Sequence, residues 1–253
     1  MKSLFSLVAA CALLLGVSSS VYAQTEVTLL APNPFRGSLD QVAPGFQSKT
    51  GYKLKLTYGK GLGTRRQVAR GEIFDVSILL PPFPEALASG NIDPKSATTL
   101  ASLTLALAVK AGMPKPDIST PKALRQTLLA AKTIAFVDPT AGSDGYATRE
   151  ALQKLGVIDL IDSKITLGPT SNVAAGFVAK GEADLCIFYV NEMENRGLDV
   201  VGLLPKQFAP PVKVVAFIST HVKDMKAARA LVDYLSSPEV EASYKKDGLE
   251  PAR

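Results

Sequence analysis

Short apolar runs alternate along the chain with segments in which apolar residues recur every three or four positions. The first pattern indicates buried strands and the second indicates amphipathic helices, so their alternation is typical of an α/β fold with a parallel or mixed sheet. The expected strands lie at 27–30, 53–58, 74–80, 103–109, 133–137, 184–190, 200–204 and 212–218. The expected helices include 121–131, 172–180, 225–235, 238–244 and a helix that ends at Leu155.

The first two expected helices follow breaks in the apolar pattern. One has Ser38 as its expected N-cap and contains Pro44, which should kink or shorten it. A glycine-rich turn at 59–63 leads into the other, which carries Arg65. These breaks, like the loop at 138–145, follow a strand and precede a helix N-terminus. Ligands of open α/β sheets bind at such points, and the free N–H groups there favour anions.

Residues 1–23 have the pattern of a signal peptide. A lysine precedes an apolar stretch at 4–17, and Val21-Tyr22-Ala23 matches the small-x-small cleavage pattern. The stretch is shorter than the ~18–20 residues of a spanning helix, which argues against an uncleaved anchor. A lipoprotein site at Cys11 would leave almost no apolar segment before it. We therefore expect cleavage before Gln24 and a periplasmic mature protein.

The charge of the chain is mildly positive. The sequence has 28 Lys and Arg against 23 Asp and Glu, and removal of Lys2 with the signal peptide leaves 27 − 23 = +4. The basic residues are scattered and form no stripe interleaved with aromatic residues, so we expect no nucleic-acid partner.

Several kinds of chemistry are disfavoured by the residues present. Cys186 would be the single cysteine of the mature chain, so we expect no internal disulfide and a buried strand thiol. His221 is the single histidine, which excludes a histidine metal cluster. The glycine-rich turn lacks the Gly-Lys-Ser/Thr ending of a P-loop. The carboxylates of Asp138, Asp144, Glu192 and Glu194 show no paired spacing. We therefore expect no metal and no cofactor.

Several motifs resemble the type II periplasmic solute-binding proteins, specifically the molybdate-binding family. The resemblance covers about 27–78 and 138–252, and its order and spacing are more specific than any single motif. The motifs that carry it are RQVARG (66–71), FDV (74–76), EALQKLG (150–156), VAKGEAD (178–184), ARALV (228–232) and LSSP (235–238).

The resemblance implies an α/β fold of two lobes joined by two crossover hinge strands, which close on a ligand between them. It implies that residues 24–104 and 214–253 form one lobe and residues 105–213 the other. It also implies a small anionic ligand, a monomer and an ABC-type inner-membrane permease as partner.

The family's molybdate site uses two serine hydroxyls of the first lobe, and neither is present here. The first falls on Pro34, and the second falls on Lys60 or its neighbour Gly61. The tyrosine of the second lobe matches Tyr189. The donors at helix starts fall on Ser143 to Gly145 and on Ser171 to Asn172.

These departures favour a ligand other than molybdate. Tetrahedral oxyanions suit neutral donors, whereas Arg36, Lys60 and Arg65 would add full positive charges that suit carboxylates. The alternative is that these side chains are solvated and that the two serines are plain N-caps. The candidate ligand-binding residues are Arg36, Lys60, Gly61, Arg65, Ser143, Gly145, Ser171 and Tyr189.

Three functions follow, in the order in which we favour them. The first is capture of a small organic polyanion with two or three carboxylates. The second is isomerisation, since the same broad family includes proteins similar to bacterial aconitate isomerase, which shift a proton across an allylic system without a cofactor. In that case Lys60 or Tyr189 would be the catalytic proton carrier. The third is binding of a molybdate-like oxyanion for an ABC importer.

Overall fold

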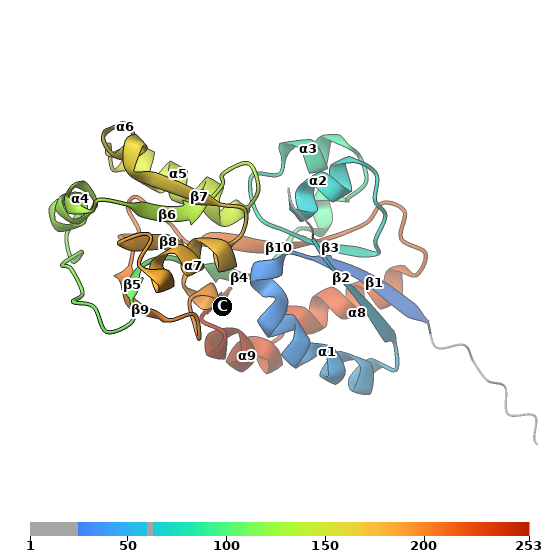
Figure 1. Ribbon diagram of the computed structural model, residues 1–253. Coiled ribbons are helices and arrows are strands. Elements are labelled where there is room, and N and C mark those ends of the chain that lie inside the picture. Colours follow the sequence, from blue (N-terminus) through green and yellow to red (C-terminus); the bar gives the residue numbers. More distant parts are fainter. Residues whose placement is uncertain (1–24, 60–62, 253) are drawn as a thin grey trace, which may run out of the picture.

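The computed structural model describes residues 25–59 and 63–252, and Figure 1 shows their arrangement. The expected signal peptide and two expected site residues, Lys60 and Gly61, lie outside these residues. The strands are β1 (Glu26–Ala31), β2 (Lys53–Tyr58), β3 (Val76–Leu79), β4 (Thr98–Leu103), β5 (Leu105–Lys110), β6 (Ile134–Val137), β7 (Ile165–Gly168), β8 (Leu185–Tyr189), β9 (Leu198–Leu203), β10 (Val212–Ile218) and β11 (Glu250–Pro251).

The α-helices of the described residues are α1 (Arg36–Thr50), α2 (Thr64–Ala69), α3 (Pro84–Ala88), α4 (Pro121–Ala130), α5 (Ser143–Lys154), α6 (Ile158–Ile161), α7 (Ser171–Lys180), α8 (Met225–Leu235) and α9 (Glu241–Lys246). Short 3-10 turns at Asn33–Phe35 and Val190–Glu192 follow β1 and β8. None of the described helices has the length and hydropathy to cross a membrane.

The described strands form two mixed sheets. One has the order β11-β4-β10-β3-β1-β2, and the other has the order β7-β6-β8-β5-β9. In the first, β2 and β3 both run parallel to β1; in the second, β7 and β8 both run parallel to β6. We call the parts of the chain around these sheets the first and the second lobe. The expected α/β fold with two lobes is confirmed.

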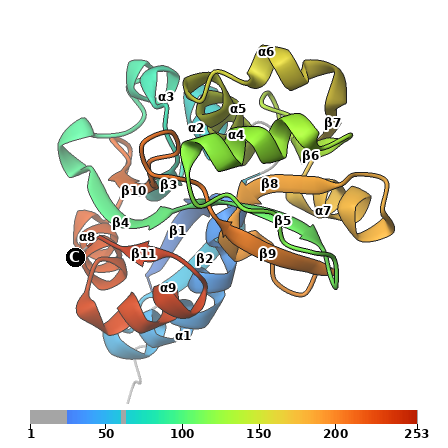
Figure 2. The same ribbon diagram turned by 90° about the vertical axis from the view of Figure 1, so that its left-hand side faces the viewer.

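Helices cover both faces of each sheet. In the first lobe, α2 and α3 pack through Val68 and Ala86 on one face, while α1 and α8 pack on the other. In the second, α7 covers one face, and α4, α5 and α6 cover the other. Figure 1 shows the two layered lobes side by side, and in Figure 2 the second lobe faces the viewer.

The chain crosses between the lobes twice. It passes from β4 to β5 at Thr104, which is buried, and from β9 to β10 along residues 204–211. The two connections fit the expected crossover strands. The predicted lobe boundaries at 104 and 213 stay a prediction of which residues would move together.

Three local expectations were wrong. The apolar run at 103–109 is not one strand. Leu103 ends β4 in the first sheet and Leu105 begins β5 in the second, and both are buried, so the apolar pattern does not reveal the change of sheet at Thr104. Ser38 is not an N-cap: the helix begins at Arg36, and the Ser38 hydroxyl donates to Asp247 at 2.7 Å. Pro44 does not shorten the helix, which runs on to Thr50.

Candidate functional site

A cavity of about 130 Å³ lies where loops of the two lobes face each other. Its walls come from the segments after β1 and β2 in the first lobe and after β6, β7 and β8 in the second. These are the carboxyl ends of strands, where open α/β sheets bind ligands. The lining residues are Pro32, Asn33, Pro34, Gly59, Gly63, Val137, Ala141, Gly142, Ser143, Asp144, Pro169, Thr170, Ser171 and Glu192.

The first-lobe wall is made of two loops tied together by Asn33. Its side-chain amide donates to the carbonyl oxygen of Gly59 at 3.1 Å, and the Gly59 N–H donates to Ala31 at 2.8 Å. A Cβ atom on Gly59 would lie 2.7 Å from the Thr64 side chain and 3.2 Å from its backbone nitrogen. Only glycine therefore allows the loop to approach the start of α2 so closely.

The second-lobe wall presents the N-termini of two long helices. Ser143 is the first residue of α5 and Ser171 the first of α7, and both line the cavity. A Cβ atom on Gly145 would lie 2.1 Å from the carbonyl oxygen of Val137, so glycine is required where α5 approaches β6. The dipoles of both helices and the free N–H groups at the start of α7 make this wall favourable for an anion.

Two carboxyl groups share the same wall. Asp144 is buried, and Glu192 is half-buried at the edge of the cavity. Burial raises the pKa of Asp144 to about 6, against the opposing effects of its own N–H, the Gly145 N–H and Arg196. Burial, together with repulsion from Asp144, raises the pKa of Glu192 to about 7. The expectation that these carboxylates are merely scattered was wrong, because adjacent strands β6 and β8 bring them together.

A short hydrogen-bonded chain holds Glu192. The Ser171 hydroxyl donates to Glu192 Oε1 at 2.8 Å and accepts from Arg196 Nη1 at 3.5 Å. Ser171 is therefore an orienting group for a carboxyl as well as the first residue of α7. Its N-terminal neighbour Thr170 is the N-cap, with its hydroxyl accepting from the Val173 N–H. The interpretation of Ser171 as a plain N-cap is therefore wrong.

Tyr189 lies at the end of β8, and its side chain is fully buried. Its hydroxyl oxygen has no hydrogen-bond partner among the described residues. Burial and the charge of Asp144 raise the pKa of the hydroxyl, and the nearby Ser143 side chain opposes this shift. A buried polar atom left without a partner is costly, so it requires an explanation.

Arg65 bridges the lobes beside the cavity. It is half-buried, donates from Nη1 to the Pro81 carbonyl at 3.1 Å and lies 5.8 Å from the ring centroid of Tyr146 in α5. Burial, and after it the charge of Arg66, lowers its pKa. Arg65 forms no ion pair with any described residue.

Arg36 points differently. Its exposed guanidinium stacks on Tyr58 with 3.7 Å to the ring centroid, and Nη2 lies 3.4 Å from Asn33 Oδ1. Arg36 therefore contacts Asn33, which lines the cavity, but does not line the cavity itself.

The structure thus brings together part of the predicted set. Ser143 and Ser171 line the cavity, while Gly145, Tyr189 and Arg65 lie behind or beside its walls. Asn33 and Glu192 were not predicted, and Asp144 was included only as part of the helix start from Ser143 to Gly145, not for its carboxyl group. Asn33 stands next to the proline that replaces a family serine, and this was the signal available for it in the sequence. No such signal existed for the pairing of Asp144 with Glu192, because these two residues are far apart in the chain.

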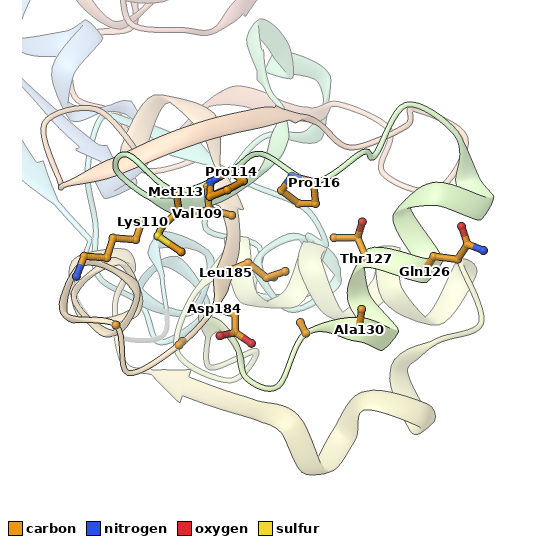
Figure 3. Close-up of a pocket in the computed structure, with 13 residues that line it drawn as sticks. Val109, Lys110, Met113, Pro114, Pro116, Gln126, Thr127, Ala130, Asp184 and Leu185 are labelled. Atoms are coloured by element: carbon orange, nitrogen blue, oxygen red, sulfur yellow. The ribbon is translucent and has the colours of Figure 1, made fainter.

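A larger cavity of about 730 Å³ lies at the other end of the second sheet, shown in Figure 3. Val109 and Leu185, which pair there, are at the opposite ends of their strands from Leu105 and Tyr189. Its lining is mostly apolar, with Lys110 and Asp184 at its edge. The Asp184 carboxylate already accepts the Lys132 N–H at 2.6 Å. The described residues hold no cluster of side chains suited to a metal ion.

Relatives of known function share nearly the whole length of the chain. An aconitate isomerase from Pseudomonas sp is 31% identical over 249 residues, which cover 95% of this chain and 94% of the relative. The molybdate-binding protein ModA of Escherichia coli (strain K12) is 26% identical over 250 residues, which cover 96% of each chain.

The fold also matches solved structures. The periplasmic molybdate-binding protein of Azotobacter vinelandii superposes with a TM-score of 0.70 at 22% identity, over 90% of this chain and all of that one. Residues 27–250 match the family model of the bacterial extracellular solute-binding proteins. Since the matched range contains almost all of the two-lobed fold and both walls of its cavity, the chain belongs to the bacterial extracellular solute-binding proteins.

Proposed function

We propose that this protein is exported to the periplasm and binds a small organic anion with two or three carboxylates in the cavity between its lobes. The observation that carries this proposal is Arg65, a half-buried cation between the two lobes that forms no ion pair with a described carboxylate. A guanidinium in such a position favours a planar carboxylate, which it can bind through two parallel hydrogen bonds.

The other groups of the site support an anionic ligand. The N-terminus of α7 offers free N–H groups, the dipole of α5 points its positive end at the cavity, and Ser143 adds a hydroxyl. The unpartnered hydroxyl of Tyr189 gains a partner if a ligand oxygen, or a rotated Ser143, reaches it. Lys60 and Gly61 lie outside the described residues, so their contact with the ligand stays a prediction from the sequence. An ABC-type permease is the proposed partner that would receive the ligand.

Isomerisation of an unsaturated tricarboxylate is the second candidate function. It is favoured by the pair of carboxyls with raised pKa values on the cavity wall and by the similarity to an aconitate isomerase. In such a reaction a base removes a proton from the methylene carbon. The charge spreads over the adjoining double bond and carboxylate, and a proton returns to the other end of the allylic system. The raised pKa of Tyr189 keeps its hydroxyl protonated, so it suits Tyr189 to donate a hydrogen bond to the developing charge rather than to act as the base.

One experiment separates these functions. The mature protein is incubated with cis-aconitate, and trans-aconitate is followed by proton NMR; thermal shifts with citrate and molybdate are measured on the same sample. Turnover identifies an isomerase, whereas a citrate shift without turnover identifies a carboxylate receptor. A shift with molybdate alone overturns the proposal in favour of oxyanion binding.

A matched pair of variants tests the site. Arg65→Gln is expected to weaken citrate binding, or to slow turnover, by about tenfold or more, since a charge-assisted hydrogen bond contributes ~1.5–3 kcal/mol. Lys60→Ala is expected to have an effect of similar size. The control is Arg70→Gln. It removes an exposed arginine at the end of α2, the helix that carries Arg65, and is expected to change affinity less than twofold.

A further inference from the structure

Glu192 presents one free carboxyl oxygen at the cavity. Its Oε1 atom accepts the Ser171 hydroxyl at 2.8 Å, and its side chain is part of the cavity lining. No hydrogen bond to Oε2 is formed by the residues that the structure describes. The group is therefore held in place at one oxygen and available at the other.

The charges around Glu192 come from several elements. Asp144 of α5 and Asp247, which follows α9, both disfavour an ionised Glu192, while Arg196 and the Ser171 hydroxyl favour it. Tyr189 of β8 also interacts with it and is neutral below its raised pKa. Together with burial, the two acidic neighbours outweigh Arg196 and Ser171, and the pKa of Glu192 is raised.

A carboxylate ligand meets a chemical mismatch at this point of the wall. An ionised carboxyl group only accepts hydrogen bonds, and two such groups repel each other. One proton between them turns the repulsive contact into a hydrogen bond. Asp144 adds to the repulsion because it disfavours an ionised Glu192. It cannot move away, since it is buried and bonded to the N-terminus of α5.

We propose that Glu192 makes the cavity bind a carboxylate anion together with one proton, which the Glu192 carboxyl shares with a ligand oxygen. This inference rests on the proposed function. When the ligand binds above neutral pH, one proton is taken from the solvent, and it returns there on release.

The test measures that proton directly. Propane-1,2,3-tricarboxylate is the probe because it has no hydroxyl group that could donate to Glu192 and no double bond to isomerise. Binding to the mature protein is measured by titration calorimetry at pH 8 in two buffers of different ionisation enthalpy. The buffer dependence of the heat gives the number of protons taken up. Citrate is titrated in the same way as a second probe.

We expect the wild type to take up about one proton and to lose about tenfold in affinity per pH unit between pH 7.5 and 8.5, as linkage to one proton requires. Glu192→Gln is expected to bind with no proton uptake and with affinity that changes less than twofold over this range. Glu194→Gln removes an exposed carboxyl two residues away and is expected to behave as the wild type.

The outcomes separate the two proposals. Binding of propane-1,2,3-tricarboxylate by the wild type without proton uptake overturns the role of Glu192 and leaves the proposed function in place. The same conclusion follows if a folded Glu192→Gln protein, checked by circular dichroism, still takes up the proton. If neither probe binds, the proposed function itself fails and this inference fails with it.

Discussion

Two buried tyrosines differ in what their hydroxyl groups contact. The Tyr244 hydroxyl donates to the Leu235 carbonyl at 2.6 Å, whereas the Tyr189 hydroxyl has no partner among the described residues. Both rings are almost completely buried. The first hydroxyl stabilises the fold, and the second is a polar group kept in the protein interior at a cost to stability.

We therefore predict opposite effects of the same substitution. Tyr244→Phe is expected to lower the free energy of unfolding by about 1 kcal/mol, because it removes a buried hydrogen bond. Tyr189→Phe is expected to leave it unchanged or to raise it, and to weaken ligand binding. Urea unfolding followed by circular dichroism measures both. A loss of stability in Tyr189→Phe equal to that in Tyr244→Phe would contradict the assignment.

The buried Asp144 makes stability depend on pH. Its pKa is raised from 3.8 in the unfolded chain to about 6, so between these values the folded state holds more protons than the unfolded state. Lowering the pH through this range therefore stabilises the fold, and raising it removes that stability. We expect the wild type to be more stable at pH 5 than at pH 7.5.

The variant Asp144→Asn is expected to flatten this dependence by on the order of 2 kcal/mol between pH 4 and 6.5. A residual slope in the same direction should remain from Glu192, whose pKa is also raised. Asp233→Asn, which changes an exposed carboxyl on α8, serves as control and should keep the full slope. Thermal unfolding at a series of pH values gives the comparison, and a slope unaffected by Asp144→Asn would refute it.

At the scale of elements, the site depends on how closely α5 approaches β6. Gly145 faces the Val137 carbonyl, and a Cβ atom there would meet backbone rather than a flexible side chain. The start of α5, which carries Ser143 and Asp144 on the cavity wall, is therefore placed by a glycine that has no side chain at the contact with β6.

Gly145→Ala is predicted to destabilise the protein by ~1–3 kcal/mol and to weaken ligand binding, because the start of α5 must move. Gly176→Ala in α7 is the matched control. A Cβ atom at Gly176 meets nothing within 4 Å, so this substitution is expected to be stabilising by about 0.5–1 kcal/mol. Thermal unfolding and citrate titration of the two variants measure these effects. Equal behaviour would show that the contact with Val137 does not limit the helix.

The elements with a strong pattern could be predicted from the sequence, and the pairings between them could not. The helix expected at 225–235 has those bounds, and the strand at 53–58 likewise. The strands β7 and β11 were missed because they are short and partly exposed, with little apolar pattern, and β4 was missed apart from Leu103. The turn at 59–63 and the loop at 138–145, which were predicted as candidate ligand sites because each lies between a strand and a helix, contribute residues to opposite walls of the cavity.

The acidic pair was missed for a related reason. Asp144 and Glu192 follow β6 and β8, which are neighbours in the sheet but lie far apart in the chain. Sheet order depends on tertiary packing, and a local apolar pattern carries no information about it. The similarity to molybdate-binding proteins identified Tyr189 but not the carboxyls beside it.

At the scale of the whole molecule, one cluster of buried apolar side chains extends through both lobes. It includes Phe46 and Leu231 of the first lobe and Phe136 and Leu152 of the second. Close to the cavity, the Asn191 side chain donates to the Pro34 carbonyl at 2.7 Å and so ties the lobes together. The lobes therefore share a core as well as two chain crossings.

This continuity predicts a single cooperative unfolding transition. Because the sequence has no tryptophan, tyrosine fluorescence is the natural probe of packing, with far-ultraviolet circular dichroism as the probe of secondary structure. The midpoints of the two urea curves are expected to coincide. Two separated transitions would show that each lobe holds its own core independently.

The buried thiol of Cys186 offers a way to follow the opening of the second sheet in the native protein. Cys186 is fully buried in β8, and burial raises its pKa to about 12, so the native protein presents almost no thiolate to an alkylating reagent. Modification must wait for the second sheet to open. In a chain that starts at Gln24, this is the single thiol, and its labelling rate measures how often the second sheet opens. A ligand bound between the lobes would lower that labelling rate by the factor by which it stabilises the closed sheet.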